Sequence, residues 1–231
     1  LSPRPSARQF RGKADSPLVV YRSAAERSAN PERLNLDRRH LATCPMLRSE
    51  ENVRLLNYQN NYITSISHLS HLPNLIFLDL YNNSIEDIGN ELSCVPTLRV
   101  LMLGKNRIGR IGKSLEALAK LDVLDLHSNL IEKIEGLQNL SELRVLNLAG
   151  NRLKVVENIW PLQSLTELNV RRNMIESAAR QELECLPSLQ RIFMSNNRVR
   201  QFEDVPAIVF AGQCTRFGGY GCGCGGSGEG A

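Results

Sequence analysis

Apolar residues recur through most of the chain in one frame, L-x-x-L-x-L, and an asparagine follows three residues after the last leucine. Five clear copies are LIFLDLYNNSIEDI from Leu75, LRVLMLGKNRIGRI from Leu98, LDVLDLHSNLIEKI from Leu121, LRVLNLAGNRLKVV from Leu143 and LTELNVRRNMIESA from Leu165. Leucines two residues apart point to the same side of an extended segment. Each copy therefore predicts one short strand with one apolar edge, followed by a turn.

The asparagines set the period of the pattern. They are separated by 22, 23, 23, 22, 22 and 24 residues, which is the period of leucine-rich repeats. The seven are Asn61, Asn83, Asn106, Asn129, Asn151, Asn173 and Asn197. We expect each asparagine to bond the backbone of its own turn and of the next, so that together they form a structural ladder.

One repeat has a single buried edge and cannot close a core alone, so its leucines are buried only by stacking on neighbours. The predicted fold class is α/β: a leucine-rich repeat solenoid with a curved parallel sheet on its concave face and short helical or irregular convex segments. Seven repeats are expected from Val53 to about Ile208, after a half-repeat cap formed by Leu34, Leu36 and Leu41. The convex segment IESAARQELECL, within the repeat from Leu165, is expected to be a helix.

Composition divides the chain into three parts. We predict a disordered basic leader over residues 1–32, the repeat domain over 33–208 and a flexible glycine-rich tail over 209–231. Because the chain begins at Leu1 and not at methionine, we also expect it to be a piece of a longer protein.

The outward strand positions are the predicted partner-binding surface, because repeat arrays present this face to other proteins. Tyr81, Met102 and Phe193 are expected to be exposed anchors, and Arg171, Arg172 and Arg191 a basic rim. The complete predicted set is Asn57, Asp79, Tyr81, Met102, Asp125, His127, Asn147, Asn169, Arg171, Arg172, Arg191 and Phe193.

Charge argues against nucleic acid as the partner. Residues 1–33 contain seven Lys or Arg and three acids, which leaves 21 residues of each sign in the rest of the chain. A neutral body lacks the electrostatic footprint of a nucleic-acid-binding domain. Apolar runs also stay short of the roughly 20 residues that a membrane helix needs, so no membrane contact is expected.

Catalysis, cofactors and metals are not expected. Gly112-Lys113-Ser114 ends like a phosphate-binding loop, but Arg107 stands where that loop needs its first glycine. His127 and Asp125 have no accompanying nucleophile or oxyanion donor.

The cysteines indicate a reducing compartment. Cys44, Cys94 and Cys185 lie among apolar repeat positions and are expected to be small core residues. Cys222 and Cys224 lack the two further ligands of a structural metal site.

The strand and turn residues resemble one family in particular. The frame with short convex loops resembles the intracellular leucine-rich repeats typified by the regulatory subunit of type-1 protein phosphatase. Within that class, the segments LDLY, LGKN and LDLH, preceded by RLNLDRRHLATCP, are most similar to the leucine-rich repeat subunits of tubulin polyglutamylase complexes. The resemblance covers roughly residues 33 to 205.

This resemblance implies a noncatalytic scaffold whose partners are the other subunits of the complex and microtubules. Its implied location is the cytoplasm and cytoskeleton, at the cilium or basal body. Two other adaptor classes stay open, a type-1 phosphatase regulatory subunit and an axonemal dynein-associated protein, because they would use the same face. A spliceosomal relative is disfavoured by the neutral body.

Overall fold

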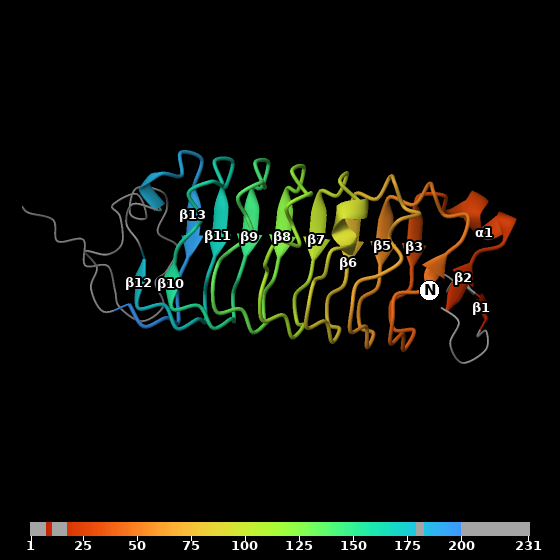
Figure 1. The fold of residues 1–231 in the computed structure, drawn as a ribbon, viewed down its shortest axis with the longest axis horizontal. Coiled ribbons are helices and arrows are strands. Elements are labelled where there is room, and N and C mark those ends of the chain that lie inside the picture. The colour runs from red at the N-terminus through yellow and green to blue at the C-terminus, as the bar shows by residue number, and fades with distance from the viewer. Residues whose placement is uncertain (1–7, 11–17, 179–182, 200–231) are drawn as a thin grey trace, which may run out of the picture.

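The computed structural model describes residues 8–10, 18–178 and 183–199. Eight parallel strands form one long sheet in which almost every strand lies beside the next one along the chain (Figure 1). The strands are β3 (Arg33–Asn35), β5 (Leu55–Asn57), β6 (Phe77–Asp79), β7 (Val100–Met102), β8 (Val123–Asp125), β9 (Val145–Asn147), β11 (Glu167–Asn169) and β13 (Arg191–Phe193). The predicted parallel-sheet solenoid is confirmed.

The register follows the leucine frame. Leu56, Leu78, Leu101, Leu124, Leu146 and Leu168 occupy equivalent positions in consecutive paired strands, and each has an exposed fraction of 1% or less. They form one continuous core with the leucines and isoleucines of the convex segments. The half-repeat cap is part of the same sheet, because Leu34 on β3 pairs with Leu56 on β5.

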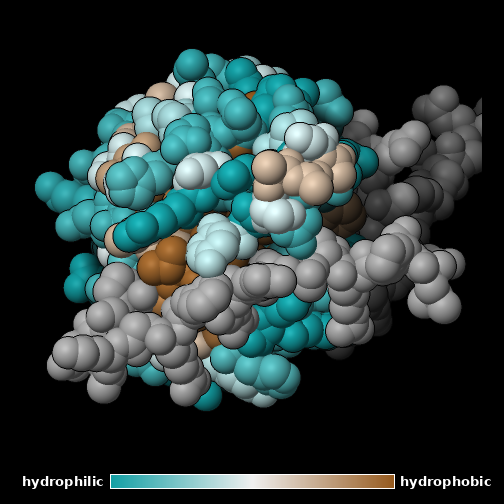
Figure 2. All heavy atoms as spheres, turned by 90° about the vertical axis from the view of Figure 1, so that its right-hand side faces the viewer, coloured by the Kyte–Doolittle hydropathy of each residue, from teal (hydrophilic) through white to brown (hydrophobic). Residues whose placement is uncertain are grey.

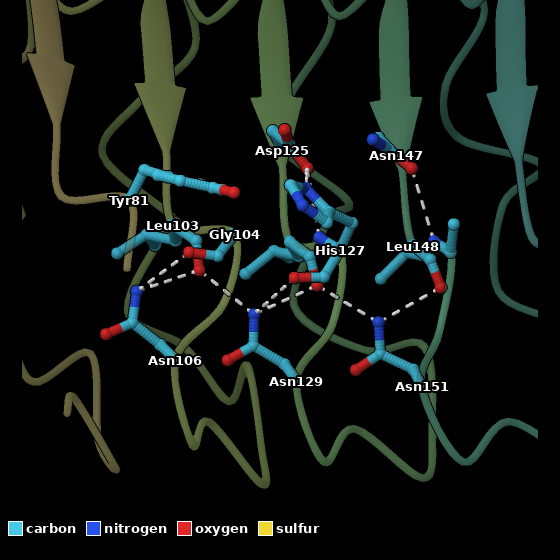
Figure 3. Close-up of polar contacts among 12 residues, drawn as sticks. Tyr81, Leu103, Gly104, Asn106, Asp125, His127, Asn129, Asn147, Leu148 and Asn151 are labelled. Carbon is cyan, nitrogen blue, oxygen red and sulfur yellow. Dashed lines mark hydrogen bonds and ion pairs between the residues drawn. The ribbon is translucent and has the colours of Figure 1, made fainter. Parts of the chain in front are cut away.

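The asparagine ladder forms, but it points the other way along the chain. The Asn129 amide donates to Leu126 O of its own turn and to Leu103 O of the preceding repeat, at 3.0 and 2.9 Å. Its Oδ1 accepts the N–H of Ile108, also in the preceding repeat, at 3.0 Å. The prediction that each asparagine bonds the next turn was wrong, because the carbonyls left open at a strand end face the asparagine that follows. Figure 3 shows three rungs of this ladder.

The convex side contains little regular structure. It includes the 3-10 helix η1 (Glu91–Cys94) and a parallel pair of two-residue strands, β10 (Val155–Val156) and β12 (Ser177–Ala178). The helix predicted for IESAARQELECL is wrong at its start, where β12 pairs with β10, but Leu183 and Glu184 near its end are helical. Residues 179–182 of that segment lie outside the described residues.

The Gly112-Lys113-Ser114 segment belongs to the return path of a repeat. Gly112 and Gly136 both have a positive φ, 57° and 71°. A Cβ atom added to Gly136 would lie 1.7 Å from the carbonyl oxygen of Gly112. The absence of a side chain at Gly136 lets two neighbouring convex loops pack backbone to backbone.

The N-terminal part differs from the predicted disordered leader. Residues 18–32 contain β2 (Val19–Tyr21) and helix α1 (Ala24–Ala29), and β2 lies between β1 (Arg8–Phe10) and β4 (Met46–Leu47) in a separate three-stranded sheet. Ser23 and Glu26 form a capping box that begins α1. Seen from this end, the described surface is mostly hydrophilic (Figure 2).

A buried ion pair attaches this segment to the first repeat. The guanidinium of Arg22 contacts both carboxylate oxygens of Glu50, and both side chains are almost fully buried. Arg22 Nη1 also donates to the carbonyl oxygens of Asn30 and Arg33, at 2.5 and 2.9 Å. The sequence could not predict this contact, because composition does not reveal which arginine of the segment has a buried partner. The tail predicted for residues 209–231 lies outside the described residues.

Cysteine burial also differs from the prediction. Cys44 is buried, as expected for a core residue, but Cys94 and Cys185 are exposed. Both lie on convex segments whose apolar contacts come from neighbouring residues, Leu92 and Val95 beside Cys94 and Leu183 and Leu186 near Cys185. Apolar spacing alone does not separate these positions.

Candidate functional site

The outward strand positions form the sheet face, which we define by two columns of residues. The first column is Asn57, Asp79, Met102, Asp125, Asn147, Asn169 and Phe193, and the second is Gln59, Tyr81, Gly104, His127, Ala149, Arg171 and Ser195. Parallel pairing in constant register places both columns across the sheet from β5 to β13.

Most polar residues of the first column have a structural role that the sequence analysis missed. The side-chain oxygen of each accepts the N–H of the residue two positions later, where the strand ends. The distances are 2.8 Å for Asn57 to Gln59, 3.0 Å for Asp79 to Tyr81, 2.9 Å for Asp125 to His127 and 3.2 Å for both Asn147 to Ala149 and Asn169 to Arg171. The sequence signal for this role is an Asn or Asp at the first-column position of every repeat except those with Met102 or Phe193.

Burial corrects the predicted surface. Asp79 and Asp125 are buried, at 4% and 8% exposure, so their carboxylates contribute little area to a partner. Tyr81, Met102 and Phe193 are half-buried and not freely exposed. The remaining first-column asparagines, Asn57, Asn147 and Asn169, are half-buried, while Arg172 and Arg191 are exposed.

The middle of the sheet face contains a cluster from three successive repeats, which we call the central cluster: Tyr81, Gly104, Lys105, Asp125 and His127. His127 Nδ1 lies 2.8 Å from Asp125 Oδ1, which fixes the imidazole (Figure 3). The Tyr81 ring lies 5.6 Å from the His127 ring, and the Lys105 ammonium lies 5.2 Å from the Tyr81 ring centre. Rigid aromatic groups beside a cation are typical anchors of protein interfaces.

Gly104 makes room for this cluster. A Cβ atom at this position would lie 2.4 Å from both Nδ1 and Cε1 of His127, closer than any real contact. The imidazole therefore lies directly over the backbone of the preceding repeat. The predicted partner-binding set included Tyr81, Asp125 and His127 but neither Lys105 nor Gly104, because the sequence shows positions within one repeat and not contacts between repeats.

Electrostatics at the N-terminal side of the cluster centre on Asp79. Burial raises the pKa of its carboxyl above the ordinary value, and the nearby Asp125 and Asp37 carboxylates raise it further. Hydrogen bonds from the Gln59 side chain and the Tyr81 N–H act in the opposite direction. The ionised form of Asp79 is therefore less favourable in the folded protein than in water.

The C-terminal end of the sheet face is basic and partly stacked. The Arg171 guanidinium carbon lies 4.4 Å from the centre of the Phe193 ring, while Arg191 pairs with Glu167 at 2.8 Å. The predicted anchor Phe193 and the predicted rim residue Arg171 therefore stack on each other. Arg172 and Arg191 are both exposed, and of the two Arg191 is paired with Glu167.

Other kinds of site find no support in the part of the chain that the structure describes. Over residues 8–10, 18–178 and 183–199, no three His, Cys, Asp or Glu side chains gather as metal ligands would, and Cys222 and Cys224 lie outside these ranges. Within the same ranges no helix is long and apolar enough to cross a membrane.

Comparison with known proteins agrees with the repeat geometry. Models described as leucine rich repeats match residues 51–94, 96–153 and 142–199. Human leucine-rich repeat-containing protein 49 is 48% identical over 70 residues, which are 30% of this chain and 10% of that protein. The mouse protein of the same name is 50% identical over 59 residues, 26% of this chain and 9% of that protein. The chain therefore matches about a tenth of the length of these relatives.

Solved structures extend the comparison to the whole array. The Listeria monocytogenes internalin InlF has a TM-score of 0.60 and 25% identity, over 69% of this chain and 46% of its own. A complex of latrophilin 3, Unc5D and FLRT2 gives a TM-score of 0.60 and 27% identity, over 74% of this chain and 60% of that chain. In that complex the leucine-rich repeats belong to FLRT2, which is assembled with latrophilin 3 and Unc5D. With its eight-stranded sheet, its asparagine ladder and these matches, the chain belongs to the leucine-rich repeat family.

Proposed function

We propose that this chain is part of a noncatalytic scaffold subunit of a tubulin polyglutamylase complex, and that the central cluster is its main contact with another subunit. A leucine-rich repeat solenoid is typical of protein-interaction modules and not of enzymes. The ligase activity of such a complex would belong to a separate chain, and the complex would act on microtubules at the cilium or basal body.

One observation carries the proposal. LDLY, LGKN and LDLH, the segments that resemble polyglutamylase subunits most specifically, end in Tyr81, Gly104-Lys105-Asn106 and His127. Of these, only Asn106 is required by the repeat ladder. The others come together in the central cluster, where their rings and the Lys105 ammonium contact one another. Residues that distinguish the family thus lie at one place on the sheet face.

The test is an affinity purification of the full-length protein from ciliated cells. The parent should co-purify a tubulin ligase, and Tyr81→Ala with Lys105→Ala should lose most of it, since truncation of an interface anchor costs about 2 kcal/mol or more. Tyr62→Ala is the control, because Tyr62 is 59% exposed, stacks on His40 and belongs to neither column of the sheet face.

Each outcome separates the candidates. A phosphatase or dynein heavy chains in place of the ligase would assign the protein to another adaptor class. Capture of the ligase by the double variant at the parent level would move the contact off the central cluster.

A further inference from the structure

A second surface lies outside the sheet face, on the flank where the strands begin. Two recesses of about 520 and 470 Å³ adjoin there and share Pro31 and Asn52. We call them together the flank groove. Its charged lining includes four cations, Arg27 on helix α1 and Arg54, Arg99 and Lys120 along the repeats.

Backbone hydrogen bonds between neighbouring repeats place Arg54 and Arg99 in one row. The N–H of Arg54 donates to Glu32 O at 2.8 Å, that of Ile76 to Arg54 O at 2.9 Å and that of Arg99 to Ile76 O at 2.8 Å. Adjacent rungs are about 4.8 Å apart, so the backbones of Arg54 and Arg99 are about 10 Å apart. Half-buried Ile76 lies between them, so the groove has an apolar position between cations. The next rung after Arg99 is Asp122, whose carboxylate is held by Arg144 at 2.6 Å, and Lys120 lies two residues before Asp122.

The acids nearby do not neutralise the groove. Glu32 lies 3.5 Å from Arg54, and Glu142 lies 3.3 Å from Arg99. All four side chains are about half exposed, and exposed pairs of this kind contribute little and exchange readily. Glu50, which also lines the groove, is buried and held by Arg22.

Two cations of the groove have no ion pair with any residue that the structure describes. In the described ranges, the structure records no acidic partner for Arg27 or Lys120. The lining therefore has excess positive charge, although the body of the protein is neutral.

We infer that the flank groove binds an extended acidic peptide segment of a partner protein. Acidic chains repel themselves into extended forms, and in a polyproline II conformation every third side chain recurs on one face at about 9 Å. That repeat matches the separation of about 10 Å between Arg54 and Arg99. Carboxylates three residues apart would meet these two arginines, and the next would reach Lys120. The groove is separate from the central cluster, so this inference does not depend on the ligase contact.

The probe is a fluorescein-labelled peptide of about eight glutamates, long enough to span the groove. A glutamine peptide of the same length and a single-stranded oligonucleotide of similar charge serve as comparisons. Binding to the full chain is followed by fluorescence anisotropy at about 50 and 300 mM NaCl, because screening should weaken contacts between exposed charges at the higher salt. We expect saturable binding of the glutamate peptide only, weaker at high salt.

Variants locate the site. Arg99→Gln with Lys120→Gln should weaken binding about tenfold, the sum of two exposed charge contacts. The control is Lys133→Gln with Arg152→Gln, which removes the same charge from the other flank, beyond the strand ends. It should change the affinity less than about twofold. Thermal melts confirm that both double variants are folded.

Three results would overturn the inference. They are no binding of the glutamate peptide at low salt, equal loss in the groove and control variants, and tighter binding of the oligonucleotide that is lost in the same groove variant. The last result would identify the groove as a nucleic-acid site. None of them would alter the outcome of the ligase purification, which depends on the sheet face.

Discussion

The imidazole of His127 lies over Gly104 of the preceding repeat, so closely that a methyl group on Gly104 would be 2.4 Å from two ring atoms. Asp125 holds the ring in this position through Nδ1 at 2.8 Å. The central cluster therefore depends on a residue without a side chain. Because φ of Gly104 is not in the left-handed region, the requirement is for space and not for backbone freedom.

Gly104→Ala should therefore destabilise the protein through His127 alone. We expect a loss of about 1 to 3 kcal/mol in the free energy of unfolding, the usual cost of overpacking. In Gly104→Ala with His127→Ala, the loss relative to His127→Ala should nearly vanish. Urea unfolding of the parent, both single variants and the double variant gives the coupling energy. A coupling near zero would mean that the ring moves aside without cost.

Asn129→Ala should cost about 2 to 4 kcal/mol, because it leaves the Ile108 N–H unsatisfied in the interior and removes one of the two amide hydrogen bonds that Leu103 O and Leu126 O each accept. Asn139→Ala is the matched control. Asn139 is exposed and makes one bond, to Glu116 O at 3.1 Å, so its loss should stay within about 0.5 kcal/mol. Thermal melts compare the two variants, and equal melting midpoints would show that the ladder asparagine does not stabilise the fold.

Asp79→Asn should raise stability at neutral pH. A carboxyl whose pKa is raised by burial binds its proton more tightly when folded, so the parent loses stability as the pH rises above the unfolded pKa of about 4. The asparagine cannot ionise and can still accept the Tyr81 N–H. The difference in unfolding free energy between variant and parent should therefore grow from pH 4 to 7.

Asp122→Asn is the control with the opposite sign. The hydrogen bond from Arg144 lowers the pKa of Asp122, so this carboxylate contributes stability above pH 4 that is lost as the pH falls. The variant should be less stable than the parent at pH 7 and approach it in acid. If both variants shift in the same direction, the assigned pKa directions are wrong.

Thiol reactivity should divide the described cysteines into two classes. Burial raises the pKa of Cys44 to about 11, and its side chain is shielded. Iodoacetamide at pH 8 should therefore alkylate Cys94 and Cys185, which are exposed, long before Cys44. Peptide mapping by mass spectrometry at several times measures this. Early labelling of Cys44 in folded protein would show that the N-terminal repeat opens locally.

The repeat frame could be predicted because its leucine spacing is present within every single repeat. Leucine spacing determines which side of a strand is buried, so Leu78 and Leu124 could be placed in the core from the sequence. Contacts between repeats were harder to predict. His127 and Gly104 are 23 positions apart, one repeat, and only the stacked register shows that they touch.

The N-terminal segment and the flank groove could not be predicted for a related reason. Arg22 and Glu50 are 28 residues apart and outside the repeat frame, so no periodicity connects them. Arg54 and Arg99 occupy the same repeat position, two repeats apart, but Ile76 and Asp122 occupy it in the repeats beside them, and Lys120 lies at another position of the frame. A charged groove becomes visible only when the rungs are stacked.

The backward direction of the asparagine ladder has a consequence for synthesis. Since the turn that ends at Ile108 is completed by Asn129, a repeat leaving the ribosome lacks one acceptor and one donor contact from that asparagine until its successor emerges. Folding of a nascent chain would then trail the ribosome by one repeat. Each newly made asparagine would lock the turn behind it, as a zip closes from one end.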